Sequence, residues 1–388
     1  MTKYKLKVFS LIERYIGKSI KAMPLLDRWL ISEIIPPLIF SVSSFIVLCL
    51  SFGELLYLIR MVINTNLTWS IAIEILFLKL PGYLTLALPM ATLLGCLLAF
   101  SKLNNNSEIK ALRAIGIGHR RVIISAMCIG LAMSILTFTF NNHLAPFANA
   151  KADLALRKGL GQSSDIAYKR NIIYSNFNDK KDLDALFFAE EYKDDAMLNI
   201  TIVDYSEGKP NSMIVANKGI WNNKTKNWLL TNGTILPYNK SLNLERTSFL
   251  EYSYKLNYGP IMIAKIPDSA NNMNLSQVRS AMELYKQSGN LKEERKLKVR
   301  FQEKFTVPLS CLIFSIIGST LAIKKSKVKG SGQSIAFGGS IILILFYYTV
   351  SFLFSSLGMS GNLHPFIAAW SPIGLFLLGG EYFIRQSY

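Results

Sequence analysis

The chain has 388 residues, of which 51% are hydrophobic, and its mean hydropathy is positive. This composition argues against an ordinary soluble protein of this length and favours a membrane protein. The formal net charge of +18 would suggest nucleic-acid binding in a soluble chain. In a membrane protein Lys and Arg gather in cytoplasmic loops, so no nucleic-acid partner is expected.

Residues 1–33 are predicted to form a basic cytoplasmic extension followed by an interfacial helix. The basic residues of this stretch include Lys3, Lys5, Lys7 and Arg14. The stretch lacks the compact apolar core and the small-residue cleavage site of a signal peptide, so we expect it to be retained.

Six apolar segments are long enough to cross the roughly 30 Å hydrocarbon core of a bilayer. They lie at about 34–60, 71–101, 121–143, 305–323, 335–356 and 365–385. The predicted fold class is therefore a membrane α-helical protein with six transmembrane helices. Three lie in residues 34–143 and three in residues 301–388, on either side of a polar middle.

The short loops predict the orientation of these helices. Positive charge gathers in 102–121 and 324–329, whereas 61–70 and 357–364 carry no charge. By the positive-inside rule, both termini should be cytoplasmic and the polar middle should face the other side of the membrane.

The middle, residues 144–300, is predicted to be a separate extracytoplasmic β domain. Residues 248–258 alternate between two faces, with Leu250 and Tyr252 on the face expected to be buried. Residues 212–221 and 227–236 flank a polar turn, which is typical of a hairpin. Several such strands predict an antiparallel sandwich or roll.

The loop segment 104–118 is predicted to hold a short amphipathic helix. Ser107 is expected to cap the helix, and Glu108 in the first turn complements the helix dipole. Ile109, Leu112 and Ile115 form an apolar stripe, Lys110 and Arg113 point elsewhere, and Gly116 and Gly118 end the helix. Two interpretations stay open. The helix lies at the membrane interface, or it docks in a groove of a cytoplasmic ATPase.

The sequence contains no motif for an energy source of its own. The glycine cluster Lys329-Gly330-Ser331-Gly332 lacks the lysine that a phosphate-binding loop needs, and there is no His-Glu-x-x-His pattern. We therefore expect a protein that is not an enzyme and needs no cofactor or metal. Its energy would come from a partner or from an ion gradient.

Four charged residues lie within or beside the first two predicted spans: Glu54, Arg60, Glu74 and Lys79. An unpaired charge costs on the order of 3 kcal/mol at mid-membrane, so these groups should pair or face a wet cavity. Arg60 has two interpretations, snorkelling to the interface or contact with a head group. Glu54 is expected to pair within the protein, whereas Glu74 and Lys79 are expected near the interface.

Several short motifs follow one another along almost the whole chain. They are Leu26-Asp27-Arg28-Trp29, Leu88-Pro89-Met90-Ala91-Thr92-Leu93-Leu94-Gly95, the segment from Ser107-Glu108 to Gly116, Phe305-Thr306-Val307-Pro308-Leu309, Gly332-Gln333-Ser334, and Gly361-Asn362-Leu363-His364-Pro365 with Trp370. Each motif alone is weak. In this order, with three spans on each side of a polar insert, the chain resembles the lipopolysaccharide-export permease family, LptF/LptG (also called YjgP/YjgQ).

The resemblance implies a β-jellyroll domain between the third and fourth membrane helices. It also implies a second related permease, as a hetero- or homodimer, and a dimeric cytoplasmic ABC ATPase. In this family the ATPase drives glycolipid from the inner membrane onto a periplasmic jellyroll bridge. The first and fifth spans would form a lateral gate.

The resemblance also assigns roles to individual residues. Glu108 matches the carboxylate of the family's coupling helix, and Leu112, Arg113 and Gly116 accompany it there. Arg60 matches a basic position that meets the anionic head group. Together with Glu54 and Lys79, it is a candidate for the substrate cavity or gate.

The sequence therefore predicts an inner-membrane permease subunit that exports lipopolysaccharide or a related anionic glycolipid. Two alternatives stay open. One is an ion-driven secondary transporter that uses Glu54, Glu74 and Lys79 as a relay. The other is a non-transporting membrane scaffold for envelope assembly.

Overall fold

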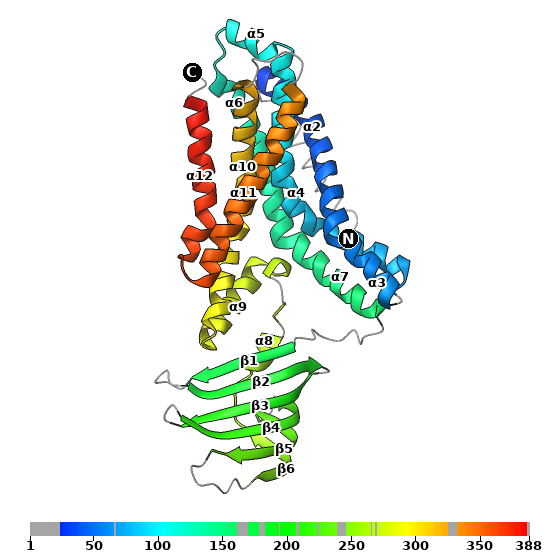
Figure 1. Ribbon diagram of the computed structural model, residues 1–388, viewed down its shortest axis with the longest axis vertical. Coiled ribbons are helices and arrows are strands. Elements are labelled where there is room, and N and C mark those ends of the chain that lie inside the picture. Colours follow the sequence, from blue (N-terminus) through cyan, green and yellow to red (C-terminus); the bar gives the residue numbers. More distant parts are fainter. Residues whose placement is uncertain are drawn as a thin grey trace, which may run out of the picture.

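The computed structural model describes residues 24–65, 67–160, 170–177, 183–193, 195–206, 209–222, 225–238, 246–264, 266–267, 270–324 and 332–385. Residues 1–23, most of the predicted basic extension, lie outside this description, as do residues 325–331 of the second positive loop. A bundle of long helices occupies one end of the molecule and a β domain the other (Figure 1).

Long apolar helices form the bundle. The helical elements before the β domain are α2 (Leu25–Leu50), η1 (Ser51–Leu55), α3 (Leu56–Thr65), α4 (Trp69–Asn105), α5 (Glu108–Ala114), α6 (His119–Thr139), η2 (Phe140–Leu144) and α7 (Ala145–Gly159). Those after it are α8 (Gly259–Ala264), η3 (Ala270–Asn272), α9 (Leu275–Gln287), α10 (Leu291–Lys324), α11 (Gly332–Ser360) and α12 (Pro365–Arg385).

Five helices among the described residues are long and apolar enough to cross a membrane. They are Leu25–Thr65, Trp69–Asn105, His119–Gly159, Leu291–Ile323 and Phe337–Ser360. They coincide with the first five predicted spans. The sixth predicted span coincides with α12, which packs against α10 and α11, and its role as a membrane span stays a prediction.

The helices run past the ends of the predicted spans. The first and third each contain one π-helical segment, η1 and η2, and continue beyond it as α3 and α7. The domain boundary predicted at residue 144 therefore falls inside a continuous helical run. The boundary predicted at residue 300 likewise falls inside α10. Pro81 and Pro89 lie within α4, which is helical throughout.

A glycine allows a close contact between two helices of the bundle. A Cβ at Gly95 of α4 would lie 2.8 Å from the Cα of Leu38 in α2, a distance too short for any side chain. The motif that ends at Gly95 thus lies where α2 and α4 meet. Around it, buried residues of α2, α4, α6 and α10 form one hydrophobic cluster.

The β domain is a six-stranded antiparallel sheet in the order of the sequence. Its strands are β1 (Arg170–Phe177), β2 (Leu183–Lys193), β3 (Ala196–Ser206), β4 (Lys209–Asn222), β5 (Asn227–Pro237) and β6 (Thr247–Tyr254). The predicted hairpin is confirmed, because β4 and β5 pair from Ser212 opposite Pro237 to Asn222 opposite Asn227. β1 lies nearest the helices and β6 farthest from them (Figure 1).

The described strands form an antiparallel β domain, as predicted, but not the Greek-key order that defines a jellyroll. Each strand pairs with the next one along the chain, which gives one up-and-down sheet. One face of the sheet packs against α8, α9 and the beginning of α10, around Trp228 and Phe187. Leu250, expected on the buried face, is 81% exposed.

Candidate functional site

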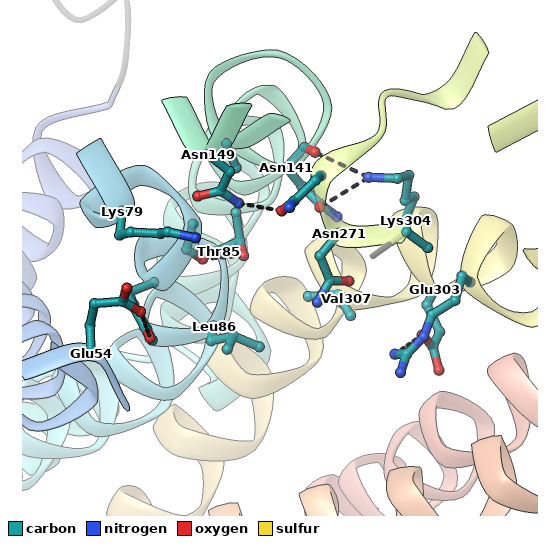
Figure 2. Close-up of a pocket in the computed structure, with 16 residues that line it drawn as sticks. Glu54, Lys79, Thr85, Leu86, Asn141, Asn149, Asn271, Glu303, Lys304 and Val307 are labelled. Atoms are coloured by element: carbon teal, nitrogen blue, oxygen red, sulfur yellow. Dashed lines mark hydrogen bonds and ion pairs between the residues drawn. The ribbon is translucent and has the colours of Figure 1, made fainter. Parts of the chain in front are cut away.

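A polar cavity of about 400 Å³ lies where the bundle faces the β domain. Its walls come from η1, α4, η2, α7, η3 and α10. The lining residues are Glu54, Lys79, Gly82, Tyr83, Thr85, Leu86, Asn141, Ala145, Asn149, Ala270, Asn271, Asn272, Arg300, Glu303, Lys304 and Val307. Glu54 and Lys79 stand on one side, and Glu303 and Lys304 on the other (Figure 2).

Two of the three residues predicted for a substrate cavity or gate line this cavity together, and each has a partner. Glu54 lies in the π-helical segment η1 and accepts a hydrogen bond of 2.9 Å from the Tyr83 hydroxyl. Lys79 of α4 forms an ion pair of 3.1 Å with Asp153 of α7. These contacts connect the first three membrane helices at the level of the cavity.

Arg60, the third predicted residue, is not part of the cavity lining. It lies on α3 and is exposed, and it forms no ion pair with the residues that the structure describes. Glu74 is exposed on α4. The sequence predicted these two charges within or beside the first two spans. In the structure both are exposed, and neither lines the cavity.

The opposite wall of the cavity was not predicted. Arg300 and Lys304 are four residues apart on α10, so they face the same side of the helix. Between them Glu303 accepts hydrogen bonds from Arg300 (2.7 Å) and from Ser355 of α11 (2.6 Å). The signal for this wall was in the sequence, because these charges stand directly before the motif that begins at Phe305.

The predicted short helix of segment 104–118 is α5, at the end of the bundle opposite the sheet (Figure 1). Two details differ from the prediction. Ser107 does not cap the helix through its side chain, because its backbone is left-handed, with φ of 63°. The apolar stripe is shorter than predicted: Ile109 is buried and Leu112 half-buried, but Ile115 is 73% exposed.

The remaining predicted residues of α5 form its solvent face and its end. Glu108 is half-buried and accepts a hydrogen bond of 2.9 Å from Asn106, while Lys110 and Arg113 are exposed. Gly116 has φ of +90°, which favours glycine. At this turn the N–H groups of Gly116 and Ile117 donate to the carbonyls of Arg113 and Leu112, both at 3.0 Å, which is a Schellman motif.

Polar contacts fix the end of the bundle that carries α5. Asp27 of α2 accepts two hydrogen bonds of 2.6 Å from Arg121 of α6 and one of 2.7 Å from Ser125. Asn104, which is buried near the end of α4, donates to the carbonyls of Ala322 and Ile323 in α10 at 2.9 and 3.0 Å. These contacts join α2 to α6 and α4 to α10 at this end of the bundle.

Comparison with known proteins identifies this arrangement. Residues 28–386 match the family described as "Lipopolysaccharide export system permease LptF/LptG". The chain belongs to this family. The LptF/LptG match covers both membrane blocks and the whole β domain, so the membership does not rest on the hydrophobic helices alone.

Two curated relatives agree with the LptF/LptG membership. Both are named "Lipopolysaccharide export system permease protein LptG", from Escherichia coli strain K12 and from Escherichia coli O6:H1. Each is 20% identical over 303 residues, which cover 78% of this chain and 81% of the relative. With its membrane-crossing helices, the chain is thus an inner-membrane permease subunit of the LptF/LptG type.

Proposed function

We propose that this chain is the membrane subunit of an ABC-type exporter. It extracts lipopolysaccharide or a related anionic glycolipid from the inner membrane, and a separate cytoplasmic ATPase drives the step. The observation that carries the proposal is the position of α5. It presents an exposed face with Lys110 and Arg113 at the end of the bundle opposite the β domain (Figure 1).

The anchoring of α5 supports a coupling role. Ile109 is buried among residues of α4 and α6, and Leu112 packs against the same cluster. The Schellman turn at Gly116 fixes the other end of the helix. A push on the exposed face of α5 would therefore move the packed membrane helices rather than bend a loop.

The β domain supports a hand-over to a periplasmic bridge. β6 is an edge of the described sheet and lies farthest from the helices (Figure 1). An edge strand carries unpaired backbone N–H and C=O groups, which can pair with a strand of another protein. We propose that a periplasmic jellyroll protein docks at this edge.

Exposed apolar side chains support a second permease copy or relative beside this chain. Along α2, η1 and α11 they include Phe40, Phe52, Ile342, Phe346 and Phe352, all more than half exposed. Such faces contact lipid acyl chains or another membrane helix. We propose that α2 and α11 line the lateral gate for the lipid at the interface between the two permeases.

The proposal is tested by purifying the chain together with its candidate ATPase, with Glu108→Arg as the variant. Charge reversal on α5 should abolish co-purification or reduce lipid-stimulated ATP hydrolysis by at least about tenfold, since a charge-assisted contact contributes about 1.5–3 kcal/mol. Glu74→Gln is the matched control, because Glu74 is exposed at the other end of the helices.

This pair of variants also separates the alternatives. An ion-driven transporter would lose activity with Glu74→Gln and work without any ATPase. A scaffold would show no bound glycolipid in either variant. If Glu108→Arg leaves complex formation and export unchanged, α5 is not the coupling element.

A further inference from the structure

Lys304 is a buried cation with weak partners. Lys304 lines the cavity, and the residue is only 5% exposed. Its Nζ donates to the backbone oxygen of Asn141 at 3.3 Å and to the Asn141 Oδ1 at 3.5 Å (Figure 2). It forms no ion pair with any carboxylate of the described part of the chain. A buried ammonium without an anion is costly, and bringing in an anion lowers that cost.

The neighbouring charges already have partners. Lys79 pairs with Asp153, and Arg300 pairs with Glu303. With Asp153, the partner of Lys79, included, three cations (Lys79, Arg300 and Lys304) face three acids (Glu54, Glu303 and Asp153), which gives 3 − 3 = 0. Lys304 is the cation of this set without a carboxylate partner, because Asp153 pairs with Lys79 and Glu303 is held by Arg300 and Ser355. Glu54 binds the Tyr83 hydroxyl instead.

Asn149 adds a second unsatisfied group on another wall. It is 8% exposed, and its Oδ1 is buried without a hydrogen-bond partner among the described residues. Its Nδ2 donates to Asn272 at 2.9 Å, so the side-chain orientation is fixed by a contact. A buried acceptor without a donor is rare in folded proteins. A ligand hydroxyl would satisfy it.

The cavity is shaped for a ligand of limited size. A volume of about 400 Å³ falls in the range of small-molecule pockets. Glu54 and Asn141 both lie in π-helical segments, one in each of two membrane helices. Such segments occur frequently at functional sites, because they turn side chains out of the regular helical positions.

A second cavity continues the path toward the β domain. It measures about 570 Å³, and Ile173 of β1, Tyr285 of α9 and Lys296 of α10 are among its lining residues. Arg300 and Ala270 line both cavities. Lys296, Arg300 and Lys304 repeat every four residues, so they form a line of cations along one face of α10.

We propose that this cavity, inside a single permease chain, holds a phosphorylated sugar. The phosphate lies against Lys304, and a sugar hydroxyl donates to the Oδ1 of Asn149. This inference rests on the proposed function and deepens it. In this proposal the glycolipid head group is recognised between the chain's own helices, away from Arg60. The site lies next to the second cavity, which Ile173 of β1 helps to line.

The test measures binding to the full-length chain in phosphatidylcholine nanodiscs. The probes are an acylated glucosamine disaccharide with two phosphates, the same lipid without phosphates, and soluble glucosamine 1-phosphate. The wild-type chain should bind the phosphorylated lipid at least about tenfold more tightly than the dephosphorylated one, as expected for a charge-assisted contact.

Four variants test which residues make these contacts. Lys304→Met should remove it, Lys304→Arg should keep most of it, and Lys292→Met should leave it unchanged. Lys292 is the matched control because it lies exposed on the same helix outside both cavities. Asn149→Leu should weaken both lipids to a similar extent, since it removes a hydroxyl contact.

A measurement that retains Lys304 covers the case in which Lys304→Met does not fold. Val307 also lines the cavity. In the variant Val307→Cys, the phosphorylated lipid should protect this thiol from alkylation, as read by mass spectrometry, and the dephosphorylated lipid should not. If glucosamine 1-phosphate protects it too, the site recognises the free sugar phosphate; protection by the lipid alone shows that the acyl chains are needed.

Equal affinity for the two lipids, or a phosphate preference that persists in Lys304→Met, would overturn this inference while leaving the proposed export function intact. If neither lipid binds the wild-type chain, the proposed function fails as well. The two failures are therefore distinguishable.

Discussion

At the scale of single residues, the contact between Asp27 and Arg121 connects the start of α2 to the start of α6. Both Asp27 oxygens accept from the guanidinium at 2.6 Å, and the carboxyl is 14% exposed. Bidentate geometry of this kind is stronger and more specific than a single ion pair. The contact explains why an acid in the motif before the first span is useful.

Replacing Asp27 with Asn should destabilise the protein. The variant leaves the Arg121 guanidinium with a neutral partner, and we expect a loss of about 1–2 kcal/mol, toward the low end because Arg121 is partly exposed to solvent. The apparent melting temperature in mild detergent should fall by several degrees. Arg28→Gln, at an exposed neighbouring position, is the control and should melt like the wild type.

The sequence could predict only part of the site at this scale. Glu54 and Lys79 stood out because a charge in an apolar span is costly. Lys304 did not stand out, because it follows the strongly charged stretch 276–300 and looks like its last solvated residue. Its burial depends on α10 packing against the third membrane helix, a contact between distant segments that no local pattern encodes.

At the scale of elements, α5 shows how a seven-residue helix is held in place. It is too short to be stable on its own. Ile109 packs into the bundle on one side, and the turn at Gly116 satisfies the last carbonyls. In the proposed coupling role, the stiffness of α5 would thus come from its surroundings.

Substitution of Gly116 with Ala should loosen α5, because a Cβ disfavours the left-handed backbone at φ of +90° by about 1 kcal/mol. Trypsin should then cleave after Lys110 or Arg113 several times faster than in the wild type. Gly118→Ala is the matched control, since Gly118 has φ of −71° and open space around its Cα. Equal cleavage rates in the two variants would show that the turn does not hold the helix.

Helix periodicity predicted most elements well, because membrane spans and hairpins carry local signals. The lengths of the spans were underestimated, since η1 and η2 let the first and third helices continue through polar residues. Ser107 and Ile115 were misplaced for a related reason. The left-handed backbone at Ser107 shifts the start of α5, and the helix ends at Ala114, before Ile115 could join the buried face.

At the scale of the whole molecule, α10 connects the two ends. Its 34 residues span about 50 Å at 1.5 Å per residue. Leu297, near its start, belongs to the hydrophobic core of the β domain. Ala322 and Ile323, near its end, accept hydrogen bonds from Asn104, which stands shortly before α5 in the chain.

Replacing Asn104 with Leu should weaken communication between the ends without unfolding either. The variant removes both hydrogen bonds to α10, at an expected cost of about 1–3 kcal/mol. In proteoliposomes with the ATPase, ATP-dependent glycolipid release should fall several-fold while ATPase binding is retained. Asn105→Leu, at the exposed neighbouring position, should release lipid at the wild-type rate. Equal loss in both variants would exclude a special role for Asn104.

The continuity of α10 has a thermodynamic consequence. Because α10 connects the β domain to the opposite end of the bundle, binding at one end can affect binding at the other. Coupling between two sites is reciprocal, so the effect acts in both directions. In the proposed exporter, a lipid bound in the β domain would therefore change the affinity of the partner ATPase for its nucleotide. When the periplasmic bridge is already filled with lipid, the ATPase on the other side of the membrane would then hydrolyse ATP more slowly.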